Sequence, residues 1–262
     1  MGEKQKEVAR FYDFLKYGLE TDDPIVGKHL LNLVGLKENN LSEEKVLEVG
    51  VGRGNWTMML AHSSGSYTGA DISLESLKYV KRKYTKNLVN ADISALPYPS
   101  DYFDRVFAIG VLPAVEKHRE GFKELARVLK PGGTIHLFLY GKVFPRNIIR
   151  DFIHYALKFF SMDKKRKICY RFALFSKYNI PESLLFRSNM EFVILDWYLA
   201  PIQNRHTYRQ IKRWMEEENI KPISFCPYPH SSSFAFHRLS ARLPILGALI
   251  SPDFFAKGIK NK

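Results

Sequence analysis

Short apolar segments recur along the first half of the chain, and each is closed by a glycine or an aspartate. Apolar runs of this length are typical of buried strands. Apolar residues at helical spacing lie between them, and Ser73 has the position of a helix N-cap. Because predicted strands alternate with predicted helices, the pattern indicates an α/β fold with a parallel, doubly wound sheet. The strands are predicted over 45–50, 66–70, 87–91, 104–109 and 134–140, and the helices over 55–62, 74–84 and 119–129.

A glycine-rich turn follows the first predicted strand, with glycines at 50, 52 and 54. Glycine adopts positive φ without a steric penalty and lets a ligand approach the backbone closely. In doubly wound sheets, ligands bind beyond the carboxyl ends of the strands. Asp71 and Asp92 close the second and third strands at that edge, where they can accept hydrogen bonds from a ribose diol and an adenine amino group. The pattern therefore predicts a site for a nucleoside.

The spacing of the turn distinguishes between nucleoside ligands. The dinucleotide fingerprint G-x-G-x-x-G requires a third glycine at the position of Asn55, and the chain also lacks the G-x-x-x-x-G-K-[ST] loop that cradles phosphates. The turn has instead the form Glu48-x-Gly50-x-Gly52-x-Gly54. A site without a pyrophosphate cradle that keeps acceptors for ribose and adenine favours S-adenosylmethionine over NAD.

Four segments in order resemble the class I S-adenosylmethionine-dependent methyltransferases, in the branch that includes the ubiquinone and menaquinone enzymes. The resemblance covers residues 45–140 and implies a Rossmann-like, doubly wound seven-stranded sheet with an inserted helical lid after the fifth strand. The matching segments are VLEVGVGRG (46–54), GADIS (69–73), NADISALPYPSDYFDRVFAIGVL (90–112) and LARVLKPGGTIHLFLY (125–140).

The resemblance also implies which residues bind the methionine end of S-adenosylmethionine. Glu48, Gly50 and Gly52 are expected along its methionine and ribose portions. Ile109 and Gly110, at the end of the fourth predicted strand, are expected to border the methyl group that is transferred.

The nucleoside end is implied in the same way. Asp71 is expected to hold the ribose hydroxyls, and Ile72 to pack on the adenine. Asp92 and Ile93 are expected to frame the adenine on its other side.

Charge divides the chain into unequal parts. The net charge is +13, but residues 1–141 contribute only +1. Residues 142–190 contribute +8 and combine lysines and arginines with aromatic residues at helical spacing. We interpret the chain as an N-terminal flap helix, predicted over 8–18, with the cofactor core (1–141), a basic helical substrate lid (142–190) and a segment that completes the core (191–262). A basic amphipathic helix also fits an anionic membrane surface.

The last segment contains the candidate acceptor-site residues. A strand is predicted over 191–199, a helix capped by Thr207 over 208–219, a strand over 223–226 and an antiparallel strand over 254–260. The run 196–219 resembles the same family, in which the loop before this helix approaches the active site. His206 and Tyr198 are the catalytic candidates, with histidine suited to a general base because its pKa lies near neutrality.

The favoured activity is in-line methyl transfer to a small lipophilic or aromatic acceptor, either anionic or presented at a membrane. Two alternatives stay open. The basic second half fits an RNA or nucleic-acid methyltransferase, and the fold also fits a binding module without catalysis. The chemistry needs no metal, because the methyl donor is already activated.

Composition limits the cellular setting. Cys169 and Cys226 form neither a CxxC pair nor a cluster with histidines, so no disulfide framework or zinc site is predicted. The charged N-terminus carries no secretory pattern, and no apolar run approaches the ~18 residues of a membrane span. A reducing, cytoplasmic setting is expected.

Overall fold

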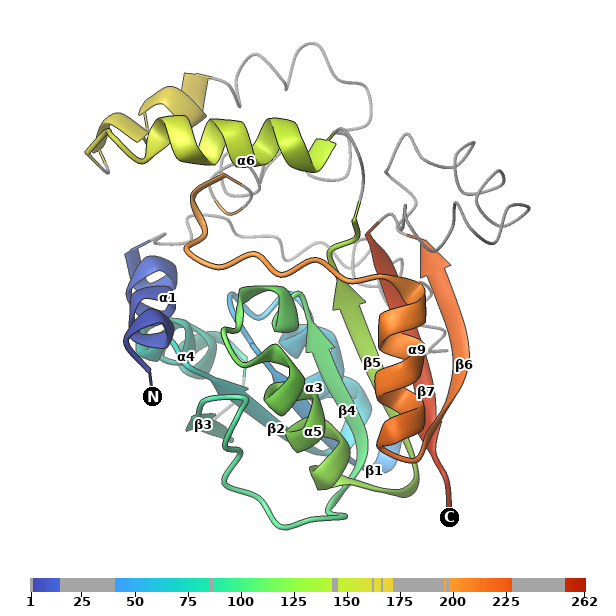
Figure 1. Cartoon of the computed structure of the whole chain (residues 1–262). Coiled ribbons are helices and arrows are strands. Elements are labelled where there is room, and N and C mark those ends of the chain that lie inside the picture. Colours follow the sequence, from blue (N-terminus) through green and yellow to red (C-terminus); the bar gives the residue numbers. More distant parts are fainter. Residues whose placement is uncertain are drawn as a thin grey trace.

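The computed structural model contains one seven-stranded sheet with helices on both faces (Figure 1). The structure describes residues 2–14, 41–84, 87–142, 146–161, 163–165, 167–171, 196, 198–227 and 253–262.

The strands follow the order β3-β2-β1-β4-β5-β7-β6. Neighbours from β3 to β5 are parallel, whereas β7 runs antiparallel between β5 and β6. The seven-stranded, doubly wound sheet and its antiparallel last strand confirm the prediction. Strand order reverses between β1 and β4, and this is where such sheets bind ligands. The strands are β1 (Leu41–Val49), β2 (Ser64–Asp71), β3 (Leu88–Asn90), β4 (Phe103–Ile109), β5 (Leu129–Leu139), β6 (Ile220–Pro227) and β7 (Phe254–Lys260).

Two helices begin as the sequence predicts. The Ser73 hydroxyl accepts the backbone N–H of Ser76 and caps α4, and Thr207 accepts that of Gln210 and caps α9. The helices are α1 (Glu3–Phe14), α3 (Thr57–Ser63), α4 (Leu74–Lys83), α5 (His118–Val128), α6 (Arg146–Leu157) and α9 (Tyr208–Glu217), with a 3₁₀ turn at Leu112–Ala114.

Side-chain alternation along the strands fills a core on each face of the sheet. Leu47 and Val106 point to the face that α5 and α9 cover, where they meet Phe122 and Trp214. Their neighbours in sequence, Val46 and Phe107, pack with Leu60 of α3 on the other face. Because both faces are buried, the central strands are apolar throughout, and this is why they were recognisable in the sequence.

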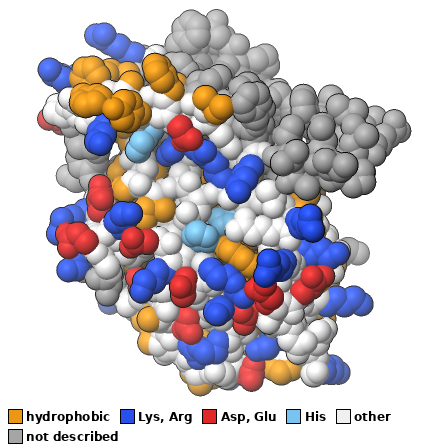
Figure 2. All heavy atoms as spheres, in the orientation of Figure 1, with side chains coloured by type: hydrophobic (Ala, Val, Ile, Leu, Met, Phe, Trp, Pro, Cys, Tyr) orange, Lys and Arg blue, Asp and Glu red, His pale blue; other side chains and the backbone are white. Residues whose placement is uncertain are grey.

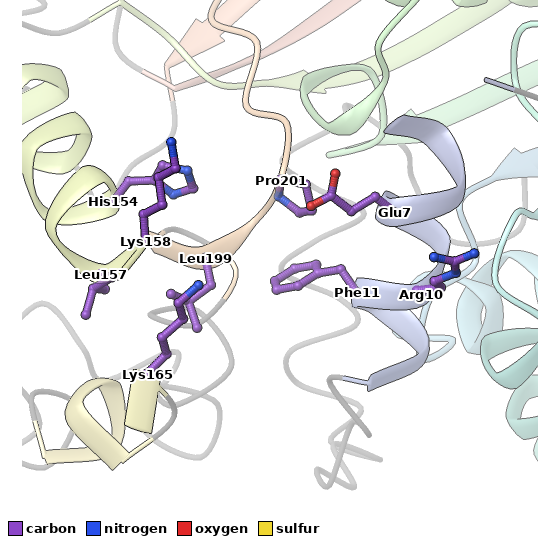
Figure 3. A pocket seen from close by; sticks show the side chains of 9 residues that line it. All are labelled: Glu7, Arg10, Phe11, His154, Leu157, Lys158, Lys165, Leu199 and Pro201. Atoms are coloured by element: carbon purple, nitrogen blue, oxygen red, sulfur yellow. The ribbon is translucent and has the colours of Figure 1, made fainter. Parts of the chain in front are cut away.

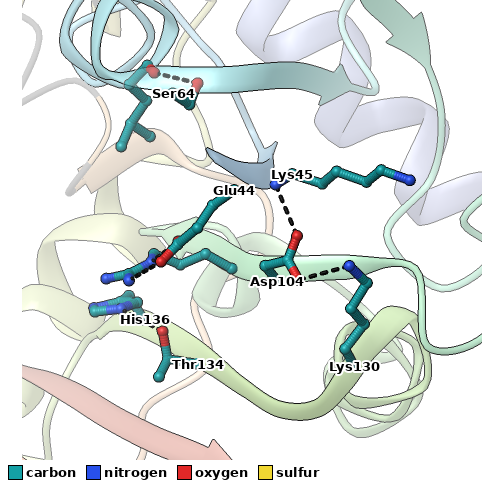
Figure 4. Close-up of polar contacts among 9 residues, drawn as sticks. Glu44, Lys45, Ser64, Asp104, Lys130, Thr134 and His136 are labelled. Carbon is teal, nitrogen blue, oxygen red and sulfur yellow. Dashed lines mark hydrogen bonds and ion pairs between the residues drawn. The ribbon is translucent and has the colours of Figure 1, made fainter. Parts of the chain in front are cut away.

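The amino-terminal edge of the sheet is held by polar contacts (Figure 4). Asp104 accepts the Lys45 backbone N–H at 2.9 Å and pairs with the Lys130 ammonium at 2.6 Å. Glu44 forms a two-bond ion pair with Arg105. These contacts join β1, β4 and β5 at the edge opposite the predicted site, so Asp104 has a structural role.

Two predicted elements differ from the structure. The predicted strand over 191–199 is wrong where it is described, because Asp196, Tyr198 and Leu199 are helical. The N-terminal helix was predicted over 8–18, but its described part begins earlier and spans Glu3–Phe14. Residues 15–18 and residues 172–195 of the chain lie outside the described residues.

The region after β5 lies over the carboxyl ends of the strands (Figure 1). There α6 stands above α1 and the end of β5. The division into core, lid and completing segment stays a prediction. Within the described residues, no helix combines the length and hydrophobicity that a membrane crossing needs.

Candidate cofactor and acceptor site

The glycine turn after β1 has a conformation that only glycine adopts readily. Gly50 has φ of +78° and donates its N–H to the Ala70 carbonyl at 2.7 Å, which joins the turn to β2. A Cβ on Gly50 would lie 2.2 Å from Cγ2 of Val111. Both the backbone and the neighbouring side chain therefore require glycine here.

Gly52 differs from Gly50 because its surroundings are open. Its φ is +48°, and a Cβ placed on it would meet no atom within 4 Å. Gly110, at the end of β4, also has positive φ, and a Cβ placed on it would have its nearest neighbour, Phe138, at 3.9 Å. Gly52 therefore leaves open space where β1 ends, whereas a Cβ on Gly110 would make an ordinary contact where β4 ends.

Asp71 holds the glycine turn in place. Its carboxylate accepts the N–H of Gly52 at 2.9 Å and that of Ser73 at 2.8 Å. Burial raises the pKa of Asp71 to about 6, against the opposing effect of the backbone hydrogen bonds. A carboxylate has about four acceptor positions, so Asp71 retains capacity for a further donor such as a ribose hydroxyl.

Helix α1 lies across this edge. Asp13 accepts the Ser73 hydroxyl beside β2, and Gln5 accepts the Glu116 N–H beyond β4 at 3.2 Å. A pocket of about 350 Å³ opens between α1, the glycine turn and α4. It is lined by Tyr12, Asp13, Gly52, Arg53, Glu75, Ser76, Tyr79 and Arg82.

Glu48 lies buried beneath the glycine turn. It accepts the Thr57 hydroxyl at 2.7 Å and the Tyr67 hydroxyl at 2.5 Å. Burial raises its pKa to about 8, although both hydrogen bonds act in the opposite direction. Glu48 therefore joins β1 to α3 and β2, and its expected place along the methionine portion stays a prediction.

The residues expected around the adenine gather at the ends of β2 and β3. The Ala91 N–H donates to the Asp71 carbonyl at 3.0 Å and holds the two ends together. Asp92 accepts the N–H and hydroxyl of Ser94, both at 2.9 Å. Ile93 is buried, whereas Ile72 is half-buried, as is Ile109 at the end of β4.

His206 is enclosed by aromatic rings. It is fully buried, lies edge-on to Trp214 and His118, and neither of its ring nitrogens has a hydrogen-bond partner in the described parts of the chain. Burial lowers its pKa to about 3, and the charges of His118 and Lys142 act in the same direction. The imidazole is therefore neutral at physiological pH.

Tyr198 lies elsewhere, where α1 and α6 meet. It packs in a cluster with Phe11, Leu157 and Leu199, and its carbonyl accepts the Nδ1–H of His154 at 2.8 Å. The structure therefore places the two catalytic candidates in different surroundings, and their roles stay predictions.

Sequence reasoning missed a buried carboxylate at this junction. Asp196 accepts the hydroxyls of Tyr12 and Tyr140, both at 2.8 Å, and burial raises its pKa. It thereby joins α1 to the end of β5. Asp196 is the first residue of the run 196–219 that resembles the family. No local sequence pattern could have shown that its partners are two tyrosines 184 and 56 positions away in the chain.

A cavity of about 440 Å³ lies between parts of α1 and α6 (Figure 3). Its apolar lining comes from both helices and from the segment at 199–201, while three cations, Arg10, Lys158 and Lys165, stand around it. The lining residues are Glu7, Arg10, Phe11, His154, Leu157, Lys158, Lys165, Leu199 and Pro201.

The segment that carries the glycine turn matches a known protein family. A family model described as a methyltransferase domain matches residues 47–137, which span β1 to β5. This part of the chain is similar to a methyltransferase domain, in agreement with the family that the sequence resembles.

Named relatives share this part of the chain. A fatty-acid O-methyltransferase of Mycolicibacterium smegmatis is 29% identical over 149 residues, covering 51% of this chain and 53% of that protein. A demethylmenaquinone methyltransferase of Tropheryma whipplei is 31% identical over 122 residues, covering 44% and 49%. The chain thus spans about half the length of the curated relatives it matches.

A solved structure extends the likeness to the whole chain. Geranyl diphosphate C-methyltransferase from Streptomyces coelicolor, solved with S-adenosyl-L-homocysteine, has a TM-score of 0.56 at 12% identity and covers 99% of this chain and 98% of that one. At a sequence identity of 12%, this similarity shows that the two chains share a fold.

S-adenosylmethionine is the cofactor that the resemblance predicted, and the residues at the edge of the sheet fit it. The open space over Gly52 admits a ligand against the backbone, and the spare acceptor capacity of Asp71 suits a ribose hydroxyl.

Proposed function

We propose that this protein transfers a methyl group from S-adenosylmethionine to a small, lipophilic acceptor that carries a negative charge. The observation that carries the proposal is the open backbone at Gly52, held by Asp71 within a methyltransferase domain. The cofactor supplies an activated methyl group, which an acceptor atom takes by in-line displacement.

The work left to the chain is to orient the reactants and to exclude water. In this proposal Gly52 and Gly110 admit the cofactor, and Asp71 accepts from its ribose. Glu48 acts as a positioning residue, because it ties the glycine turn to α3 through Thr57. Helix α1 closes the site from above, anchored through Asp13.

The cavity between α1 and α6 supports an amphiphilic anion as acceptor. Phe11 and Leu157 offer apolar surface, and the three cations offer partners for a carboxylate. A fatty acid has this chemistry, and the Mycolicibacterium smegmatis relative is named for acting on fatty acids.

Calorimetric titration tests the cofactor. The chain is titrated with S-adenosylmethionine, S-adenosylhomocysteine and NAD. We expect micromolar binding of both adenosyl ligands and none of NAD, because the turn lacks a pyrophosphate cradle. Failure of both adenosyl ligands to bind contradicts the proposal. Binding of both without methyl transfer to any acceptor would instead favour a binding module.

The acceptor cavity is tested with dodecanoate below its micelle concentration. The double variant Lys158→Ala/Lys165→Ala removes two of the cations around the cavity. We expect its dissociation constant for dodecanoate, measured by calorimetry, to rise about tenfold or more, since hydrogen bonds to charged groups contribute roughly 1.5–3 kcal/mol each.

The matched control for the cavity is Lys81→Ala/Lys123→Ala, which removes two exposed lysines of α4 and α5. It keeps the same net charge as the cavity variant. If both double variants weaken dodecanoate binding equally, the effect is one of overall charge, and the cavity is not the acceptor site.

A further inference from the structure

Helix α6 exposes a continuous stripe of large apolar side chains. The exposed fractions are 58% for Ile148, 72% for Phe152, 61% for Tyr155 and 73% for Phe159. Spacings of four and three residues place Ile148, Phe152 and Tyr155 on one face of the helix. Phe159 lies in the turn that follows α6, where its ring contacts that of Tyr155 edge-on with the ring centres 5.6 Å apart. Figure 2 shows hydrophobic side chains gathered over this end of the molecule.

The opposite face of α6 is already packed. Leu157 is buried and Ile153 lies against the same cluster, which includes Phe11 of α1. His154 donates to the Tyr198 carbonyl, and Asp151 pairs with Arg205. The helix therefore has a separate face for the body of the protein, and the described parts of the chain that pack on that face leave the aromatic stripe exposed.

Cations accompany the stripe. Lys158 lies 6.0 Å from the centre of the Tyr155 ring. The described residues that follow α6 add exposed Lys164, Lys167 and Arg171, and they extend the apolar surface with half-exposed Ile168 and Tyr170. Among the residues described from 146 to 171, the exposed acids are Asp151, which is paired with arginines, and Asp163, which stands among lysines in the sequence.

We propose that the outer face of α6, with the exposed residues Phe159, Lys164, Lys167, Ile168, Tyr170 and Arg171 that follow it, docks this protein onto a bilayer that contains anionic lipids. Aromatic side chains enter the headgroup region readily, and basic residues beside them are attracted to anionic lipids. The exposed aliphatic residues Ile148 and Ile168 favour the bilayer over RNA as partner, because RNA bases stack on aromatic rings but not on isoleucine side chains. This inference extends the proposed function but does not depend on it, because membrane docking is measured without cofactor or acceptor.

The full chain is tested by co-sedimentation with vesicles of phosphatidylcholine alone and of phosphatidylcholine with one quarter phosphatidylglycerol. We expect binding to the anionic vesicles that weakens with added salt. The variant Phe152→Ser/Phe159→Ser should bind them at least about tenfold more weakly, since two large apolar side chains no longer leave water. Both positions are highly exposed, so the variant is expected to fold, as circular dichroism checks.

The control variant is Leu74→Ser/Ile223→Ser, which removes two exposed apolar side chains from α4 and β6. It should bind vesicles as the wild type does. Equal vesicle binding by the wild type and the α6 variant would overturn the proposal. So would binding of RNA that is tighter than vesicle binding and insensitive to the α6 variant. A wild-type dimer that the α6 variant makes monomeric, with no vesicle binding, would overturn it in favour of an interface between two chains.

Discussion

The Gly52→Ala variant is expected to fold and to bind S-adenosylmethionine about 10- to 100-fold more weakly than the wild type. A Cβ at this position would meet no atom of the protein, so the packing of the chain stays as it is. The added methyl group instead occupies the space in which the proposed cofactor approaches the backbone. Overpacking of such a contact costs about 1–3 kcal/mol, which corresponds to this loss of affinity. Calorimetric titration measures it.

The matched control is Gly132→Ala, at the start of β5 and the other edge of the sheet. Gly132 also has positive φ, and a Cβ there would lie 3.9 Å from Lys262, an ordinary contact. Both variants should be destabilised by a similar amount, roughly 1–2 kcal/mol, because alanine is held in the left-handed backbone region. Cofactor affinity should fall only in Gly52→Ala. An equal loss in both variants, or unchanged affinity in both, contradicts the proposed site.

The second large effect is expected in the pH dependence of stability. The folded-state pKa of Glu48 is about 8, against an ordinary 4.5, because the carboxyl is buried. Below pH 4.5 the carboxyl is protonated in both states. Between pH 4.5 and 8 the folded chain keeps a proton that the unfolded chain releases, so the free energy of unfolding falls as pH rises. At 1.36 kcal/mol for each pKa unit, the loss reaches about 5 kcal/mol.

Glu48→Gln should remove this loss. Glutamine keeps a carbonyl oxygen that can accept from Thr57 and Tyr67, but it does not titrate. The free energy of unfolding is measured with denaturant at pH 5 and pH 8. The wild type and Glu48→Gln should be similarly stable at pH 5, and the variant should be more stable than the wild type by several kcal/mol at pH 8. The exposed control Glu120→Gln should follow the wild type at both pH values. A Glu48→Gln variant that is less stable than the wild type at pH 8 would show that the charged carboxylate is needed in the core.

Local patterns in the sequence were sufficient to predict the central strands of the sheet, the first residues of the two capped helices and the glycine turn. Buried central strands are apolar throughout, and the Ser73 and Thr207 caps bond to atoms three residues away. The turn around Gly50 was equally recognisable, because positive φ requires a residue type that the sequence displays. In each of these cases the physical cause lies within a few residues of its effect.

Tertiary contacts determined the rest. Residues 196–199 are helical where they are described, although their apolar pattern favours a strand, and Asp196 there meets Tyr12 and Tyr140 from distant parts of the chain. Histidine is a residue type suited to a general base, which is why the sequence pointed to His206. The fold packs it against the rings of Trp214 and His118, and burial lowers its pKa. The apolar face of α6 that stays in water is also invisible in the sequence, since both faces of that helix are apolar. Burial and partner choice depend on which distant residues the fold brings together, and no local spacing encodes that.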